Sequence, residues 1–535
     1  MYELRDRPEE PSSIKVDRAP TSLRLLTSVK AFLARETIIF LFIWTVLMVV
    51  GRTQFFLDPG SLWHPVVGEK ILETGRLIYT DPFSFTCADQ PWIAQWWLGE
   101  CFLALLHRAG GLDTILLATA TILAGFFTWI AHRLMARGLH PLLAVLVTAL
   151  ACLSSTYHLH PRPHLATIIF LAVTLAWLCD FEAGRISLAR LFWLVPLYIF
   201  WTNIHGGVVG GVVTLGVVIL GWILTYLMGL ESPIKSLGQA VALAILVVAC
   251  ALTCLVNPYG IALPRAWFGL MLSPVLPRLI MEHGPLMSSN VASTVLLFAL
   301  VYSVALLGVL PKWPRMTWLV PLLWFLLAWT RVRHGPLFAV TAAIALGDML
   351  PHIRWLSWLS SHGSHTCRLR QPASPDGPLA PRLRPALLPC ALVLLTLGIQ
   401  VSGLSWPLLG SGRARPNAHD IPMALLPQLQ EAARAGPPGQ PIFNDMFFAG
   451  FLIYYTPELR VFIDDRCELY GDQGLLDYAH AYFEDPAQLD RWQEQYGFDL
   501  ALVANGSGFD RYLENAPDWE VVGQTGPATL YRRRD

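Results

Sequence analysis

Polar and ionisable side chains interrupt the apolar runs of this chain at only a few places. Asp58 and His64 follow the first apolar run, and Asp81 lies further along the same polar stretch. Ionisable groups are costly near the centre of a bilayer and persist mainly beside a cavity, a pathway or one another. The clusters are therefore candidates for a single active or binding site. The later clusters are His158, His160, Arg162 and His164, then Asn203 and His205, Asn257, Glu282 and His283, and finally Arg331, Arg333 and His334.

The composition indicates that lipid is the solvent for most of the chain. Of its 535 residues, 54% are hydrophobic and 14% are charged, whereas a typical soluble protein has ~25% charged residues. The mean hydropathy is +0.49. Uncharged runs such as 207–228 and 291–310 match the ~20 apolar residues that a helix needs to cross a membrane. The formal net charge is zero, so electrostatics indicate no nucleic-acid partner.

The apolar runs predict a mainly α fold, a polytopic membrane bundle of about eleven spans. The polar clusters occupy every second gap between spans, which places them on one side of the membrane. The segment 91–108 is apolar but rich in tryptophan, so we predict that it lies at the membrane interface. The spans are 36–56, 111–132, 140–157, 164–181, 189–204, 207–229, 236–256, 291–310, 316–331, 335–350 and 386–406.

The distribution of basic residues predicts the orientation. The N-terminal tail and the gaps on its side of the membrane hold 19 Lys and Arg, whereas the gaps with the polar clusters hold nine. The positive-inside rule then places the N-terminus in the cytoplasm and the polar clusters on the outer face. An odd number of spans leaves the C-terminus outside as well. The first apolar run has no small-residue cleavage site after it, so it is expected to stay as an anchor.

These features define a predicted domain organisation. A transmembrane core covers 36–350 and includes a large first outer loop at 52–110. After the last span, the texture changes to that of a soluble α/β domain at 416–535, with strands at 441–443, 460–463, 500–503 and 529–532 and helices at 422–435 and 475–483. The cytoplasmic parts are the tail 1–35 and a basic linker at 351–385, whose composition predicts disorder.

Asp58 and Asp81 in the first outer loop are the candidate catalytic carboxylates. Asp58 follows the first span directly, so it lies where a lipid-borne head group and water meet, and it could act there as a general base. A structural interpretation stands beside this one for each residue. Asp58-Pro59-Gly60 has the composition of a turn, and Asp81-Pro82 has that of a turn or helix start.

The histidine-rich and asparagine-rich clusters are candidate substrate-binding groups. His158, His160 and His164 are broken by two prolines, a spacing that suits no helical metal site. Arg162 would either bind a phosphate or cap a helix with these histidines. Asn203 and His205 could hydrogen-bond a sugar or pyrophosphate, although the glycines after them equally suit a tight helical hairpin.

Arg331 and Arg333 put two cations on a face that the positive-inside rule disfavours, which indicates a bound phosphate or, alternatively, snorkelling side chains. Glu282 and His283 either pair with these arginines or coordinate a divalent cation, which is the one cofactor that the sequence suggests. The nine cysteines show no paired spacing, which disfavours a metal or disulfide role for them. Neither Glu282 nor His283 is assigned as a metal ligand.

A further motif lies in the α/β domain. Asp464-Asp465-Arg466 ends a predicted strand, where ligands of open α/β sheets commonly bind. The favoured interpretation is an Asp/Arg pair that fixes the following turn.

As a set, these residues are familiar. The order DPGSLWH, TDPFSFT, QPWIAQWWLGE, RPH, WTNIHGG, LVNPYG, MEHGP and RVRHGPLFA, closed by FNDMFFAGFLIYYTPELRVFIDDRCELYG, resembles a group of bacterial polytopic membrane proteins. That group is similar to the GT-C type glycosyltransferases, which use lipid-linked sugars. The resemblance covers most of residues 36–535. GT-C transferases usually have Asp-Glu after the first span, whereas this chain has Asp58-Pro59.

The resemblance implies an enzyme of the bacterial inner membrane that moves a sugar from a polyprenyl-phosphate donor to an acceptor at the outer face. It implies that Asp58 is the base and that Arg331 and Arg333 hold the donor phosphate, with Asp81, His64 and His205 shaping the pocket. The expected partners are the lipid-linked sugar and membrane lipid. Two alternatives stand beside it: a catalytically silent scaffold and a transporter or flippase for a lipid-linked saccharide.

Overall fold

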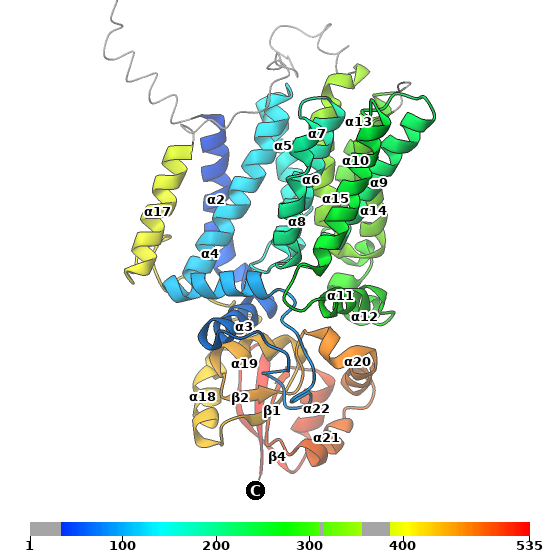
Figure 1. The fold of residues 1–535 in the computed structure, drawn as a ribbon. Helices are drawn as coiled ribbons and strands as arrows, with labels where there is room; N and C mark the ends of the chain where they lie inside the picture. The colour runs from blue at the N-terminus through cyan, green and yellow to red at the C-terminus, as the bar shows by residue number, and fades with distance from the viewer. Residues whose placement is uncertain (1–33, 311, 313, 356–385, 535) are drawn as a thin grey trace, which may run out of the picture.

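The computed structural model describes residues 34–310, 312, 314–355 and 386–534. It consists of a bundle of apolar helices with an α/β domain attached to one end (Figure 1), so the predicted fold class is confirmed. The predicted tail (1–35) and basic linker (351–385) lie largely outside the described residues.

Each of the eleven predicted spans contains a helix. Among the described residues, five helices are long and apolar enough to cross a membrane, namely α2, α4, α6, α9 and α10 with the turn that extends it, and the other apolar helices are shorter. These lengths and compositions are those of a multi-pass membrane protein. The bundle comprises α2 (Arg35–Gln54), α4 (Trp97–Ala136), α5 (Pro141–Leu153), α6 (Leu165–Glu182), α7 (Leu188–Leu191), α8 (Leu194–Thr202), α9 (Val208–Leu227), α10 (Leu237–Leu252), α13 (Ala292–Leu307), α14 (Met316–Thr330), α15 (Gly335–Met349) and α17 (Leu387–Val401).

The first large loop contains more helix than the sequence predicted. α3 (Gly60–Thr74) follows Asp58 directly, so the expected turn at Asp58-Pro59-Gly60 is instead the start of a helix. The predicted interfacial helix at 91–108 begins only at Trp97, as the first part of α4. The backbone leaves the helical conformation at Gly110 and Gly111, where Gly111 has a φ of +66°, a conformation that glycine adopts without strain.

Three short helices lie between the bundle and the α/β domain: α3, α11 (Ala262–Leu272) and α12 (Leu276–Leu279) (Figure 1). The sequence analysis predicted no helix between the spans 236–256 and 291–310, where α11 and α12 lie. One face of α11 exposes Phe268 and Leu272, whereas Trp267 is buried, as expected for a helix at an apolar boundary.

The α/β domain has a five-stranded sheet in the order β2-β1-β3-β5-β4. β1 is parallel to β2 and β3, whereas β5 is antiparallel to β3 and β4. The four predicted strands are present, and β4 is an additional one. The elements are α18 (Leu426–Ala435), β1 (Gln440–Asn444), α19 (Ala449–Tyr455), β2 (Leu459–Val461), α20 (Cys467–Phe483), α21 (Gln488–Tyr496), β3 (Leu500–Ala504), α22 (Gly508–Glu514), β4 (Trp519–Gln524) and β5 (Ala528–Arg533).

The first loop and the α/β domain are joined closely. Phe83 and Phe85 exchange backbone hydrogen bonds with Val461, so the loop pairs with the edge strand β2. A Cβ at Gly450 in α19 would lie 2.3 Å from the Pro59 carbonyl oxygen, which shows how closely α19 packs on the start of α3. Strand pairing and close helix packing therefore hold the domain against the residues around Asp58.

Candidate functional site

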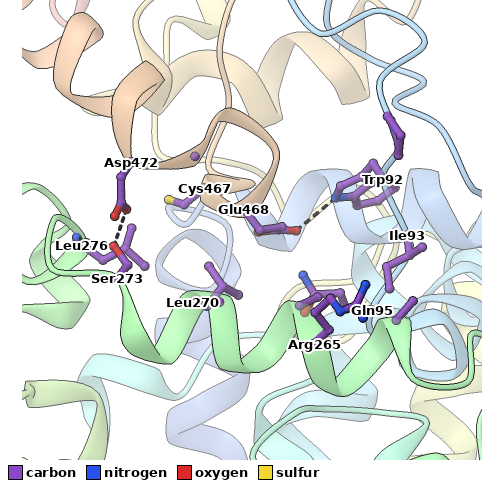
Figure 2. A pocket seen from close by; sticks show the side chains of 15 residues that line it. Trp92, Ile93, Gln95, Arg265, Leu270, Ser273, Leu276, Cys467, Glu468 and Asp472 are labelled. Atoms are coloured by element: carbon purple, nitrogen blue, oxygen red, sulfur yellow. Dashed lines mark hydrogen bonds between the residues drawn. The ribbon is translucent and has the colours of Figure 1, made fainter.

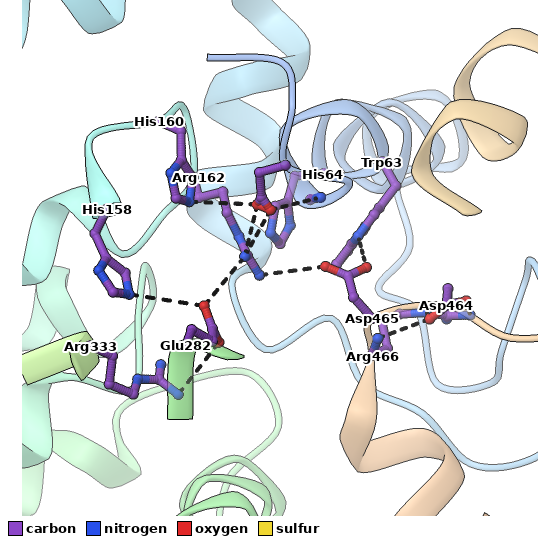
Figure 3. Close-up of polar contacts among 12 residues, drawn as sticks. Trp63, His64, His158, His160, Arg162, Glu282, Arg333, Asp464, Asp465 and Arg466 are labelled. Atoms are coloured by element: carbon purple, nitrogen blue, oxygen red, sulfur yellow. Dashed lines mark hydrogen bonds and ion pairs between the residues drawn. The ribbon is translucent and has the colours of Figure 1, made fainter. Parts of the chain in front are cut away.

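Arg162 is the centre of a charged network at the end of the bundle that meets the α/β domain. Its Nη1 donates to both carboxylate oxygens of Asp58, at 3.1 and 3.0 Å. The same guanidinium lies 3.9 Å from Glu282 and 3.8 Å from Asp465. Figure 3 shows Glu282 on one side of Arg162 and Asp465 on the other. Three carboxylates from three distant segments therefore surround one cation.

The two longer contacts lie beyond hydrogen-bond distance. Donor groups of Arg162 and acceptor oxygens of Glu282 and Asp465 are therefore free to bind a polar ligand placed between them. The Asp58 side chain is 17% exposed, so it is reachable from outside the bundle. The network has the acid, base and cation that transfer chemistry requires, within one small volume.

Glu282 links this centre to the second arginine pair. Its Oε1 lies 3.7 Å from Arg333 Nη1, and Arg333 contacts His283 Nε2 at 2.6 Å. Burial alone would raise the pKa of Glu282, but Arg333, His283 and Arg162 hold it well below the usual range. Glu282 is therefore a stable anion that holds Arg162 and Arg333 on either side of it.

Arg331 has fewer polar contacts than Arg162. It contacts the other ring nitrogen of His283 at 3.4 Å and the Met271 carbonyl oxygen at 3.2 Å. A neutral imidazole accepts at only one nitrogen, so the shorter contact from Arg333 is the hydrogen bond. Arg331 is half-buried, and these two contacts leave other donor groups of its guanidinium available to an anion.

The α/β domain contributes Asp465, which the sequence analysis did not select as a site residue. Trp63 of α3 donates an indole hydrogen bond of 2.6 Å to its Oδ1. Burial raises the pKa of Asp465 to about 7, with Arg162 opposing the rise and Asp58 adding to it. A carboxyl group with this pKa exchanges protons near neutral pH and is suited to acid–base chemistry.

The nearby histidines are kept neutral. His160 Nε2 lies 3.5 Å from Asp58, and His158 Nε2 lies 4.0 Å from Glu282. Burial lowers the pKa of His158 well below its ordinary value, and it lowers that of His205 to about 3. These rings therefore contribute shape and hydrogen-bonding capacity rather than charge.

Gly60 makes room for the central arginine. A Cβ at this position would lie 2.7 Å from Arg162 Nε, so only glycine lets the guanidinium pass over the start of α3. The loop between α5 and α6 supplies Arg162, and the turn between α14 and α15 supplies Arg331 and Arg333. Segments between helix ends on one face of the bundle thus position these three arginines.

The structure brings five of the ten predicted site residues into this network, namely Asp58, Arg162, Glu282, Arg331 and Arg333. His205 lies in a second layer, where its Nδ1 contacts Thr167 at 2.8 Å, and its ring stacks beside Trp96. His64 is buried and pairs with Glu100 at 2.9 Å.

The other three predicted residues are engaged elsewhere. Asp81 pairs with the buried Arg466 at 2.7 Å and accepts backbone hydrogen bonds from Phe83 and Ser84. Asn203 bonds to Trp97 and to two backbone carbonyl oxygens, and His334 Nδ1 contacts the Leu327 carbonyl oxygen. These contacts are structural, and the catalytic prediction for Asp81 stays untested.

The described residues contain no group of three or more His, Cys, Asp or Glu arranged to hold a metal ion. Glu282 and His283 contact the arginines, which is the first of the two alternatives that their sequence left open. The described cysteines, which exclude Cys367, are all free thiols.

Comparison with known proteins gives a fold-level likeness. No known family profile and no curated protein matches this chain. Among solved structures, it is similar to an oligosaccharyltransferase of Archaeoglobus fulgidus tethered to an acceptor peptide, with 12% identity over 88% of this chain and 69% of that one and a TM-score of 0.48.

Two further neighbours are of the same general kind. ArnT from Cupriavidus metallidurans, bound to undecaprenyl phosphate, has 15% identity over 96% of this chain and 98% of that one, with a TM-score of 0.40. The mycobacterial arabinofuranosyltransferase AftD has 14% identity and a TM-score of 0.41, and this chain covers 41% of its length. These neighbours are GT-C transferases, the class that the motifs resemble. At such identities and TM-scores, the likeness assigns no activity to this chain.

Proposed function

We propose that this chain is a membrane glycosyltransferase that moves a sugar from a polyprenyl-phosphate donor to an acceptor at the outer face of the membrane. The observation that supports the proposal is the convergence of Asp58, Arg162, Glu282, Arg333 and Asp465 at one end of an apolar bundle. Ionisable groups gathered in this way at a bilayer boundary indicate a functional site.

Asp58 is the proposed general base. It removes the proton from an acceptor hydroxyl or amine as that group attacks the anomeric carbon of the donor sugar. Arg162 holds the carboxylate in place through two hydrogen bonds, because a base must stay within hydrogen-bond reach of the proton that it removes.

Arg331 and Arg333 are the proposed partners of the leaving group. The polyprenyl phosphate departs with its bonding electrons, so its charge grows as the glycosidic bond breaks. Guanidinium groups bind phosphate oxygens through paired hydrogen bonds, and both arginines are only half-buried, so a ligand can reach them. Glu282 keeps Arg333 oriented without consuming its hydrogen bonds, since their contact is 3.7 Å long.

The test is transfer of a radiolabelled sugar from undecaprenyl phosphate by the purified full-length chain and its Asp58→Asn variant. The amide keeps the size of Asp58 and one acceptor for Arg162, so we expect an unchanged thermal unfolding midpoint. We expect transfer to fall by roughly 100-fold or more, the usual contribution of a general base.

The matched control is Asp89→Asn in the same loop, where the side chain is exposed. This control should transfer at the wild-type rate. Full transfer by the Asp58→Asn variant would remove Asp58 from the mechanism.

A further inference from the structure

A separate cavity of about 440 Å³ lies between the bundle and the α/β domain. α11 forms one wall, the start of α20 forms the opposite wall, and residues 91–95 of the first loop close one end. Figure 2 shows Trp92, Gln95 and Arg265 at one end and Ser273 and Asp472 at the other. Its volume falls in the range of small-molecule sites, of about 300–1,000 Å³.

Gln95 is a buried side chain of this cavity whose hydrogen bonding the protein itself does not complete. Its side chain is 0% exposed, and neither its amide nitrogen nor its amide oxygen makes a hydrogen bond of ordinary geometry among the described residues. Its polar neighbour in the cavity wall is Glu468, whose carboxylate it stabilises. A buried polar group without a partner is costly and is uncommon in proteins. Because Gln95 lines the cavity, a ligand there would supply the missing partners.

The remaining lining shows which ligand chemistry fits. Glu468 accepts a hydrogen bond from the Trp92 indole at 3.0 Å, and Asp472 accepts one from Ser273. Burial raises the pKa of Glu468, and Arg265 and Asp472 carry opposite charges. An aromatic side chain beside an amide and carboxyl groups, at low net charge, suits a neutral molecule with several hydroxyl groups.

α11 leaves the space for such a ligand. It turns Ala262, Ala266 and Gly269 toward the cavity, and a Cβ at Gly269 would meet no atom within 4 Å. α20 begins immediately after Asp465 and Arg466, so the wall of the cavity continues into the charged network.

We propose that this cavity binds a neutral, hydroxylated ligand of the carbohydrate class and holds the acceptor of the transfer. The identification as an acceptor rests on the proposed function, whereas the binding site itself does not. Gln95 donates to one hydroxyl and accepts from a neighbouring one, and Glu468 contacts a third. The acceptor's reacting group then extends along the start of α20 toward Asp58.

The test measures binding to the detergent-solubilised full-length chain by calorimetric titration with four probes. These are methyl glucoside and N-acetylglucosamine, which are neutral, glucosamine, which is cationic, and glucuronate, which is anionic. We expect at least one neutral probe to bind, and Gln95→Leu to weaken that binding by about tenfold, since two hydrogen bonds are lost. Gly269→Leu, which fills the cavity, should abolish it.

Gln400→Leu is the matched control, because Gln400 in α17 is also buried with its amide oxygen unpartnered among the described residues. It should bind the probes as wild type does. A purely structural Gln95 would gain stability in the Leu variant with no change in binding. Absence of binding by both neutral probes, or binding that Gln95→Leu and Gly269→Leu leave unchanged, would overturn the proposal.

The Asp58→Asn variant separates this proposal from the proposed function. It should bind the neutral probe as wild type does while failing to transfer sugar. Transfer that persists in Asp58→Asn contradicts the proposed base and leaves the binding site standing. Probe binding that is the same in wild type, Gln95→Leu and Gly269→Leu contradicts the proposed binding site and leaves the transferase proposal standing.

Discussion

Two carboxyl groups of the α/β domain stand out at the scale of single residues. Asp465 lies in the charged network, whereas Asp445 follows β1 and bonds to Tyr478 at 3.2 Å and to the Ala504 amide. Burial raises the pKa of each to about 7. A carboxyl group with a raised pKa in the folded state binds its proton more tightly there than in the unfolded chain.

These raised pKa values make the free energy of unfolding decrease as the pH rises toward and through 7. Below about pH 4 both states carry the proton, and the contribution of Asp445 is fully present. As the pH rises from there through 7, the unfolded state loses its proton first, so stability falls. We expect the thermal unfolding midpoint of Asp445→Asn to decline less than that of wild type between pH 5 and 8.

Asparagine can keep the hydrogen bonds to Tyr478 and to the Ala504 amide, so the variant should differ in pH dependence rather than in fold. Asp499→Asn, at an exposed position, should follow the wild-type curve. Parallel curves for Asp445→Asn and wild type would show that the proton on Asp445 is not linked to folding.

The sequence revealed those site residues that interrupt apolar spans. Asp58, Arg162, Glu282 and Arg333 were predicted together because they occupy every second gap between spans, which places them on one side of the membrane. Their contacts confirm that they are neighbours. Asp465 was missed because a carboxylate after a strand also suits an ordinary turn. Its neighbours do form such a turn, with Arg466 bonded to Asp464. Only the packing of the domain shows that Asp465 faces Arg162.

At the scale of elements, α3 carries the residues that the network depends on. The sequence suggested a turn here because Asp58-Pro59-Gly60 is also a common turn composition. In the structure, Gly60 opens the helix and Trp63 bonds to Asp465 one turn later. The first turn of α3 therefore lies between Arg162 of the bundle and Asp465 of the α/β domain and contacts both.

Gly60→Ala should change the position of Arg162 without changing the stability of the fold. The added methyl group would lie 2.7 Å from Arg162 Nε, and the atoms that can move are those of the arginine side chain. We expect transfer to fall by roughly ten- to a hundredfold, the effect of a displaced catalytic group, with little change in the unfolding midpoint. Sugar transfer and thermal unfolding measured on the same preparation check both expectations.

Gly125→Ala in α4 is the comparison for this variant, because a Cβ at Gly125 meets no atom within 4 Å. It should transfer at the wild-type rate and be at least as stable. Wild-type transfer by Gly60→Ala would show that the Arg162 position is not critical.

At the scale of the whole molecule, a buried ion pair between Arg466 and Asp81 holds the α/β domain to the first loop. Arg466 is 1% exposed, pairs with Asp81 at 2.7 Å and with Asp464 at 2.6 Å, and lies over the ring of Trp92. The spans and the soluble domain were predictable from hydropathy and composition. Their docking was not, because it depends on pairs such as Asp81–Arg466 that no periodicity reveals.

Arg466→Met should loosen this docking. It would leave Asp81 and Asp464 buried without their cation, which costs about 3–5 kcal/mol in comparable cases. We expect a lower unfolding midpoint and faster proteolysis within residues 80–92. The double variant Asp81→Asn with Arg466→Met should recover part of the loss, because it removes one of the stranded charges. An unchanged midpoint in Arg466→Met would show that this ion pair does not hold the domain.

The hydrogen bond from Trp63 to Asp465 joins residues 402 positions apart. A ribosome adds roughly 5–20 residues per second, so Asp465 is made tens of seconds after Trp63, when the spans between them have already left the ribosome. Until then, Arg162 lacks its neighbour Asp465. The charged network around Arg162 is therefore complete only after the last domain has been made and has folded beside the bundle.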